Sequence, residues 1–165
     1  MKIIKNFLPK EIYFKIQETL MSDSFPWFYN EDVLTPSDRK EQTSFFQFTH
    51  NFYKDKMPWS DHFHLLEPIL NIIKPISIVR IKANLNTQTK NIVETGLHKD
   101  DEDDRLRSAV FFLNTCNGYC KIINEKVYSE DNKMVLFNSN TIHTGSTTTD
   151  QKRRVLINFI YLPSL

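Results

Sequence analysis

The chain has 165 residues, of which 21 are basic and 20 acidic, and its net charge is +1. This length is sufficient for one domain with a buried core and short for two, so we expect a single domain over residues 1–165. The balanced charge provides no field that attracts nucleic acid, and a hydrophobic content of 40% excludes a disordered chain.

The N-terminal stretch MKIIKNFLPKEIYFKIQ carries charged residues throughout and lacks the apolar segment of a secretory signal peptide. No later run approaches the roughly eighteen apolar residues that a membrane-spanning helix requires. The sequence therefore predicts a cytoplasmic protein without a membrane segment. Cys116 and Cys120 fit neither a C-x-x-C redox motif nor a disulfide framework, and we expect both to be small buried hydrophobic residues.

Residues 1–75 are predicted to form a cover over a larger β structure. Apolar residues at Ile12, Ile16 and Leu20 are separated by charged ones, as in an amphipathic helix, and a proline suits its first turn. A later helical segment contains Pro68, which is expected to kink or start it. The predicted elements are a strand at 3–6, a helix at 9–21, β-prone aromatic segments at 27–29 and 43–53, and a helical segment at 62–73.

Residues 76–162 contain short β-prone segments separated by turn residues. This texture is typical of a sandwich or closed barrel, so we expect helices packed outside an antiparallel β-sandwich. Asn117 and Gly118 lie between two such segments and predict a tight hairpin, because both residue types tolerate positive φ. The predicted strands are 76–85, 96–98, 108–114, 119–123, 133–137, 141–144 and 154–161.

His98, Asp100 and His143 are the candidate metal ligands. Alternate residues of a strand lie on one face, so a strand through the HKD segment would bring His98 and Asp100 to one ion. Two imidazoles and one carboxylate form a facial triad that leaves coordination positions open for a substrate and dioxygen. A His-x-Asp pair alone is weakly specific. A catalytic site is favoured because this pair is followed along the chain by a distant histidine and then by an arginine.

Arg154 begins a strand of alternating residues that can project into a barrel. An arginine buried among Leu156, Ile160 and Phe111 is costly unless an anion neutralises it. A dicarboxylate supplies such an anion, because the guanidinium can bind one carboxylate in a bidentate pair while the other end of the ligand chelates the metal. Arg153 competes for this role, and we favour Arg154.

These segments resemble the iron(II)/2-oxoglutarate-dependent dioxygenase superfamily, and within it the prolyl-4-hydroxylase-like branch. The resemblance covers residues 76–162, and the N-terminal NFLPKEIYFKIQ is similar to the strand and helix that open many such domains. The segments that carry it are VRIKANL at 79–85, LHKD at 97–100, FFLNTCNGYCKI at 111–122, VLFNSNTIHTG at 135–145 and RVLINFIYL at 154–162.

The resemblance implies a mainly β fold with flanking N-terminal helices, the double-stranded β-helix or jelly roll. It implies a hydroxylase that uses Fe(II), 2-oxoglutarate and dioxygen, with ascorbate in support, and forms succinate and carbon dioxide. By this resemblance His98, Asp100 and His143 hold the metal and Arg154 holds the cosubstrate. The substrate is unidentified: a prolyl residue in a peptide or protein follows most directly from the branch, and a small molecule is the alternative.

The sequence departs from the family at one position beside the arginine. Relatives often have a tyrosine hydroxyl there, and this chain offers Phe111 and Phe112 instead. Asn84, Tyr119 and Asn158 are the candidates for the hydrogen bond that such a tyrosine makes to 2-oxoglutarate.

Other readings remain open. The runner-up function is a non-catalytic, cupin-like jelly-roll module that binds a metal or a carboxylate, and a third is a family member that acts only through protein contacts. His98 and Asp100 can instead be surface residues beside an acidic run, and His143 a hydrogen-bonded core residue. The sequence indicates no oligomeric state. Four aromatic residues either line a substrate groove or pack in the core: Trp27, Phe28, Tyr29 and Trp59.

Overall fold

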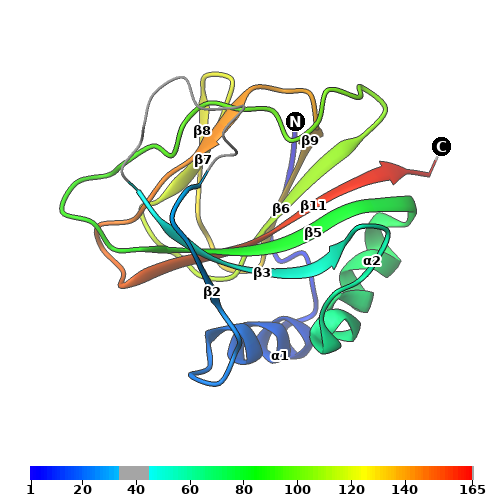
Figure 1. The fold of residues 1–165 in the computed structure, drawn as a ribbon, viewed down its shortest axis with the longest axis horizontal. Coiled ribbons are helices and arrows are strands. Elements are labelled where there is room, and N and C mark those ends of the chain that lie inside the picture. Colours follow the sequence, from blue (N-terminus) through cyan, green and yellow to red (C-terminus); the bar gives the residue numbers. More distant parts are fainter. Residues whose placement is uncertain (34–44, 165) are drawn as a thin grey trace.

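The structure is a computed structural model that describes residues 1–33 and 45–164. Within these residues, two antiparallel β-sheets face each other, and the helices lie against the outer face of the larger sheet (Figure 1). The mainly β architecture with flanking helices is therefore as predicted. The helical elements are α1 (Lys10–Met21), the 3-10 helix η2 (Asp61–Leu66) and α2 (Glu67–Ile73). The strands are β1 (Lys2–Ile4), β2 (Phe28–Asn30), β3 (Gln47–Lys54), β4 (Met57–Pro58), β5 (Pro75–Thr87), β6 (Arg107–Phe112), β7 (Tyr119–Ile122), β8 (Glu125–Tyr128), β9 (Lys133–Asn138), β10 (His143–Gly145) and β11 (Arg153–Pro163).

The larger sheet has the strand order β1-β9-β6-β11-β5-β3-β2, with β4 paired to β3, and the smaller sheet has the order β10-β7-β8. Strands β5 and β11 pair along most of their length at the centre of the larger sheet. Strand β1 pairs with β9, and β3 pairs with β5. Strands from the N-terminal segment that was expected to be a cover are thus built into the same sheet as the later strands.

Helix α1 covers the outer face of the larger sheet, and its prediction is confirmed (Figure 1). It buries Tyr13, Ile16 and Leu20, whose spacing of three and four residues places them on one side of a helix. The Tyr13 hydroxyl donates a 2.9 Å hydrogen bond to the carbonyl oxygen of Leu113. Complete burial of an isoleucine or leucine side chain contributes about 1.5–3 kcal/mol, so this apolar face holds α1 on the sheet.

The helical segment predicted at 62–73 consists of two elements, η2 and α2. Pro68 is the second residue of α2, where the absence of its N–H removes no intrahelical hydrogen bond. The proline therefore starts a helix rather than kinking one. The Ser60 hydroxyl accepts a 3.1 Å hydrogen bond from the backbone of His62 and caps η2.

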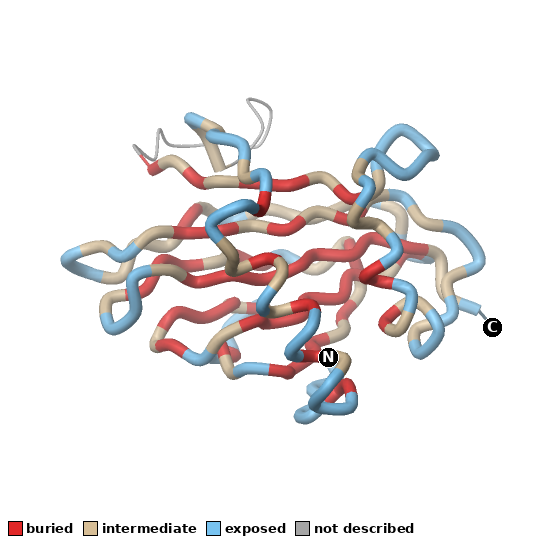
Figure 2. The backbone as a smooth tube through the Cα atoms, turned by 90° about the horizontal axis from the view of Figure 1, so that it is seen from below, coloured by how far each residue is buried: buried red, intermediate tan, exposed pale blue. Residues whose placement is uncertain are grey.

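Alternation along the strands gives the larger sheet two different faces. Odd-numbered residues such as Ile81, Ala83 and Ile157 belong to the core shared with the helices. In β5, β6 and β11 the even-numbered residues face the smaller sheet, whereas in β9 the odd-numbered ones do. The strand interiors are buried and the connecting turns are exposed (Figure 2). The core between the sheets consists of Val110, Phe112, Cys120, Ile122, Val127, Val135, Phe137 and Leu156.

The hairpin predicted at Asn117 and Gly118 is wrong. Neither residue has a positive φ, and the strands on either side, β6 and β7, belong to different sheets. The chain passes here from the larger sheet to the smaller one. The Asn117 side chain instead donates a 2.7 Å hydrogen bond to Thr149 Oγ1 and accepts one of 3.0 Å from the Thr149 backbone. This contact gives the asparagine a structural role without a tight turn.

The other predicted strands differ from the observed ones mainly in extent. Residues 96–98 form no strand, and His98 makes only an isolated bridge with His143. The N-terminal strand is observed at Lys2–Ile4, and β4 and β8 were not predicted. Residues 43 and 44 of one β-prone segment lie outside the described residues. The remaining strands of the β half are confirmed with their ends shifted by two residues or fewer.

Both cysteines are buried and free, as predicted. Cys120 lies between the two sheets, and burial raises the pKa of its thiol to about 12. The thiol therefore stays protonated and packs as an apolar group. None of the helices in the described ranges is both long and apolar enough to cross a membrane.

Candidate metal centre and its cavity

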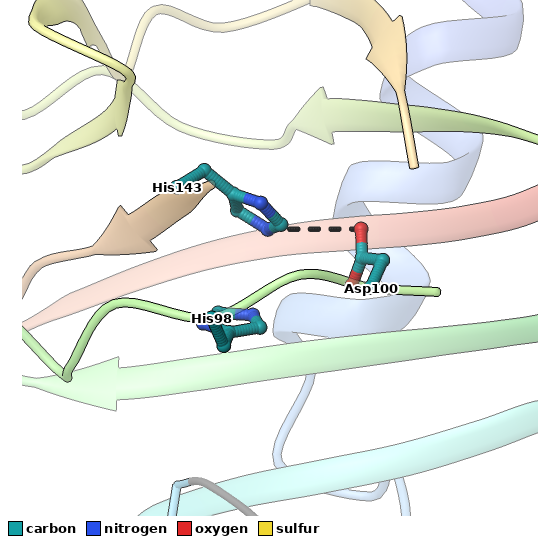
Figure 3. A group of neighbouring side chains, drawn as sticks. All are labelled: His98, Asp100 and His143. Carbon is teal, nitrogen blue, oxygen red and sulfur yellow. Dashed lines mark ion pairs between the residues drawn. The ribbon is translucent and has the colours of Figure 1, made fainter. Parts of the chain in front are cut away.

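Three chemistry-bearing side chains from two segments meet between the sheets. His143 is the first residue of β10, and His98 and Asp100 come from the loop that precedes β6 (Figure 3). The backbones of His98 and His143 are joined by two hydrogen bonds of 2.9 Å. One donor atom from each of the three side chains lies within 4.8 Å of the others, and His143 Nε2 is 3.6 Å from Asp100 Oδ2. The structure thus brings together the three residues predicted as metal ligands.

Both histidines use the same ring nitrogen for a backbone hydrogen bond. The Nδ1 atom of His98 lies 3.2 Å from the carbonyl oxygen of Gly96, and that of His143 lies 2.9 Å from the carbonyl oxygen of Thr141. A carbonyl oxygen only accepts, so Nδ1 carries the proton in each neutral ring and Nε2 keeps its lone pair. Metal-binding histidines typically donate their second ring nitrogen to a backbone carbonyl in this way.

The Asp100 side chain is only 2% exposed and is surrounded by hydrogen-bond donors. Ser108 Oγ donates to Oδ2 at 2.5 Å, and Asn158 Nδ2 lies 3.3 and 3.2 Å from the two carboxylate oxygens. Arg80 Nη2 lies 3.5 Å from Oδ1. Burial raises the pKa of Asp100, but the charges of His143 and Arg80 and the Ser108 hydrogen bond hold it below its usual range. The group is therefore a carboxylate at neutral pH.

Arg154 lines the same cavity and is almost completely buried, with 1% of its surface exposed. Its Nη1 atom donates a 3.2 Å hydrogen bond to the carbonyl oxygen of Ser146. Its Nε and Nη2 atoms have no hydrogen-bond partner within residues 1–33 and 45–164. Burial lowers the pKa of the guanidinium. A buried cation with two unsatisfied donors is unfavourable without an anion, so this end of the cavity is suited to one.

Arg154, and not Arg153, faces the cavity. Neighbouring residues of a strand point to opposite faces, and Arg153 Nη2 donates a 2.8 Å hydrogen bond to the carbonyl oxygen of Met21 at the end of α1. The Arg154 guanidinium carbon lies 5.4 Å from the centre of the Phe112 ring. Phe111, which was expected beside the arginine, belongs to the core under the helices because it has the opposite alternation in β6.

Gly118 leaves room for the Arg154 side chain. A Cβ atom at Gly118 would lie 2.6 Å from Arg154 Cδ and 2.6 Å from the carbonyl oxygen of Thr147. We expect Gly118→Ala to destabilise the fold by about 1–3 kcal/mol, because the guanidinium must move. Thermal unfolding measures this effect. Gly145→Ala is the matched control, since its nearest contact would be Thr95 Oγ1 at 3.5 Å, and equal behaviour of the two variants would contradict this role.

Two of the three residues considered as the substitute for a tyrosine hydroxyl lie on the cavity. Asn84 on β5 and Asn158 on β11 both line it. The Asn158 amide contacts Asp100, whereas Asn84 Oδ1 is buried without a partner among the described residues. Tyr119 lies elsewhere, because its hydroxyl donates to Glu94 at 2.8 Å and the residue does not line the cavity. We therefore retain the two asparagines as candidates and drop the tyrosine.

Sequence reasoning misses Arg80 and Lys82, which line the cavity, and Ser108, which donates to the Asp100 carboxylate. The segment VRIKANLN alternates polar and apolar residues, a pattern typical of a strand with one face in water. In the structure the polar face of β5 lines the cavity between the sheets. The one available signal was that this strand lies in the barrel core of the resembled family, where alternate residues point inward.

The aromatic residues considered for a substrate groove do not reach this cavity. Phe28 and Trp59 line a separate surface pocket together with His62. The indole nitrogen of Trp27 donates a 3.2 Å hydrogen bond to the carbonyl oxygen of Leu20, and Tyr29 packs against other aromatic rings. Within the described part of the chain, the one group of three metal-binding side chains in suitable proximity is His98, Asp100 and His143.

No protein-family model and no curated protein matches the sequence. Solved structures do match, and three are representative. A prolyl-4-hydroxylase from Pseudomonas putida is 13% identical over 98% of this chain and 91% of that chain, with a TM-score of 0.62. A prolyl hydroxylase from Trichoplax adhaerens, in complex with a peptide of the hypoxia-inducible-factor oxygen degradation domain, is 14% identical over 98% and 83% of the chains, with a TM-score of 0.65. HygX from Streptomyces hygroscopicus, with nickel and 2-oxoglutarate bound, is 11% identical over 99% and 82%, with a TM-score of 0.60.

At these identities the likeness concerns the fold. The chain has the double-stranded β-helix fold of the 2-oxoglutarate and iron(II) oxygenases, so the predicted fold class and the resemblance noted in the sequence are confirmed at that level. Because one fold hosts many functions, the activity must be argued from the site itself.

Proposed function

We propose that the chain is an iron(II)- and 2-oxoglutarate-dependent oxygenase that hydroxylates its substrate. The observation that supports this most directly is one cavity lined by His98, Asp100 and His143 and, on another wall, by the buried and incompletely partnered Arg154. Two neutral imidazoles and one carboxylate are the donor set of non-haem Fe(II) oxygenases. The two unsatisfied donors of the guanidinium suit a bidentate pair with the distal carboxylate of 2-oxoglutarate.

Different residues of the chain bind the two ends of the cosubstrate. The three candidate ligands hold the metal, and Arg154 binds the distal carboxylate. In the register of β5 and β11, Asn84 pairs with Leu156. Its position on β5 is midway between the two residues that pair with Arg154 and with Asn158, so the Asn84 amide faces the middle of the cosubstrate. Bound Fe(II), 2-oxoglutarate and dioxygen supply the oxidising chemistry, with release of succinate and carbon dioxide. The chain contributes orientation and an apolar wall that includes Val110 and limits the access of water.

Anaerobic titration with Fe(II) and 2-oxoglutarate tests the proposal. Wild type is expected to form the weak visible charge-transfer band of a 2-oxoglutarate chelate of Fe(II), and His143→Ala to lose it, because one imidazole ligand is removed while the fold is kept. His64→Ala is a suitable control, since the His64 ring is exposed, lies outside the cavity and hydrogen-bonds to the carbonyl oxygen of Asp61. Aerobic incubation with ascorbate and candidate substrates then measures succinate.

A non-catalytic module of the cupin type gives a different result in the same experiment. Such a protein retains metal without any dependence on 2-oxoglutarate, so a metal affinity that is unchanged by 2-oxoglutarate, together with no visible band, would refute the oxygenase.

The proposal extends to location and substrate class. Both thiols are free, which agrees with a reducing compartment, and we place the protein in the cytoplasm. A prolyl residue in a peptide is the substrate of the branch that the sequence resembles, and a small molecule is the alternative. Binding of a prolyl peptide to the protein loaded with metal and 2-oxoglutarate distinguishes the two.

A further inference from the structure

The cavity contains two cations that the metal and the cosubstrate do not require. Strand β5 projects Arg80, Lys82, Asn84 and Asn86 onto it, because alternate residues of a strand share one face. Arg80 and Lys82 are consecutive members of this row, so their Cα atoms are about 7 Å apart. The two side chains can therefore reach the same small group.

The position of Lys82 separates it from the arginine that faces 2-oxoglutarate. In the register of β5 and β11, Lys82 pairs with Asn158, whereas Arg154 pairs with Asn86. Four residues along a strand correspond to about 13 Å, while a five-carbon diacid spans about 6 Å between its ends. Arg80 and Asn158 both contact the candidate ligand Asp100. Because Lys82 pairs with Asn158, it lies near the candidate metal site and away from Arg154.

The charges on the cavity do not balance when the metal and the cosubstrate are included. Among the described residues that line it, Arg80, Lys82 and Arg154 are cationic and Asp100 is anionic, an excess of two positive charges. A ferrous ion adds two positive charges and 2-oxoglutarate two negative ones, so the excess remains. Burial and the neighbouring Arg80 lower the pKa of Lys82 to about 8, and the charge of Asp100 offsets this lowering only in part.

Both cations also have unused hydrogen-bonding capacity. Arg80 contacts Asp100 through Nη2, but its Nε is buried and has no hydrogen-bond partner within the described residues. Lys82 Nζ forms no hydrogen bond or ion pair with any residue that the structure describes, although the side chain is half-buried. Partly buried donors without a partner favour a ligand that accepts hydrogen bonds, so a ligand anion would be stabilised here.

We propose that Arg80 and Lys82 bind an anionic group of the substrate, a carboxylate or a phosphate, and thereby hold that substrate beside the metal. This inference rests on the proposed oxygenase function and narrows its substrate class. A plain prolyl side chain leaves the two cations unneutralised. A carboxylate offsets one of the two excess charges and a phosphate dianion offsets both. Either group places the carbon atoms next to it close to the metal.

Matched probes test the charge preference without turnover. The protein is loaded with Mn(II) and saturating 2-oxoglutarate, and the paramagnetic broadening of the acetyl methyl proton signal is titrated for N-acetylglycine and for its neutral counterpart, N-acetylglycinamide. The acid is expected to broaden at a concentration about tenfold lower than the amide, since a hydrogen bond to a charged group is stronger than one to a neutral group. Broadening of the phosphorus signal of inorganic phosphate in a parallel titration identifies a phosphate site.

Variants test whether Lys82 causes the preference for the acid over the amide. Lys82→Met is expected to remove the tenfold difference, Lys82→Arg to keep it, and Lys121→Met, which changes a lysine paired with Glu94 outside the cavity, to leave it unchanged. Affinity for 2-oxoglutarate is measured first in every variant. Failure of wild type to bind 2-oxoglutarate would refute the oxygenase function itself.

Three results overturn the anionic-substrate inference while leaving the oxygenase intact. The acid and the amide broaden equally, or no probe broadens, or Lys82→Met weakens 2-oxoglutarate binding as much as it weakens probe binding. The last result would assign the lysine to the cosubstrate.

Discussion

Replacement of Arg154 by methionine is expected to make the ligand-free protein more stable and to abolish tight binding of 2-oxoglutarate. The guanidinium is buried, and two of its donor atoms lack partners in the described residues. Replacement of a buried charge by an apolar side chain of similar volume is often stabilising by about 1–4 kcal/mol. Loss of one partner from a buried charged pair costs about 2–5 kcal/mol, so the Kd for 2-oxoglutarate should rise between about thirtyfold and a few thousandfold.

Thermal unfolding with increasing 2-oxoglutarate and metal measures both effects. Wild type should gain stability as the ligand concentration exceeds its Kd, while Arg154→Met starts at a higher melting temperature and gains little. Arg153→Met is the matched control, because this neighbour contacts Met21 on the opposite face of the sheet. A ligand-free Arg154→Met protein that is less stable than wild type, or that binds 2-oxoglutarate normally, would show that the arginine is a structural residue.

The sequence predicted which residues form the candidate site better than it predicted the contacts that bring them together. His98, Asp100, His143 and Arg154 were identified because few residue types bind metals or dicarboxylates and their order along the chain is distinctive. The expected reason for the convergence of His98 and Asp100 was nevertheless wrong, because residues 98–100 form no strand. The Asp100 and Asp101 amides instead donate to the carbonyl oxygen of Ser139, and His98 bridges to His143.

Local patterns were least informative where partners are distant in the sequence. The residue types Asn117 and Gly118 allow a tight turn but do not require one, and the pairing of β6 with β9 and β11 directs the chain into the other sheet. The alternation around Arg80 and Lys82 correctly indicates a strand, but it cannot say whether the polar face meets water or a cavity. That distinction depends on the smaller sheet, whose strands β7 and β10 lie far along the chain.

Substitution of Asp100 by asparagine is expected to remove metal binding. The carboxylate supplies the only anionic donor of the candidate triad, and removal of hydrogen-bonding partners of a ligand alone costs 10–100-fold in metal affinity. We therefore expect a loss of more than about a hundredfold, measured by competition of Mn(II) or Fe(II) against a chelating dye. Glu102→Gln is the control, because Glu102 belongs to the same acidic run but pairs with Lys99 and is exposed.

The metal-free protein provides an independent pH test of the same carboxylate. The folded-state pKa of Asp100 is lowered by His143, Ser108 and Arg80 despite its burial, so its ionised form stabilises the fold. That stabilisation is complete above the ordinary aspartate pKa near 4 and disappears as the pH falls through the lowered folded value. In the presence of EDTA, the difference in melting temperature between wild type and Asp100→Asn should therefore be constant at neutral pH and shrink in acid. A difference that instead grows in acid would mean that the folded-state pKa of Asp100 is raised rather than lowered, and a protonated carboxyl group is a poor metal ligand.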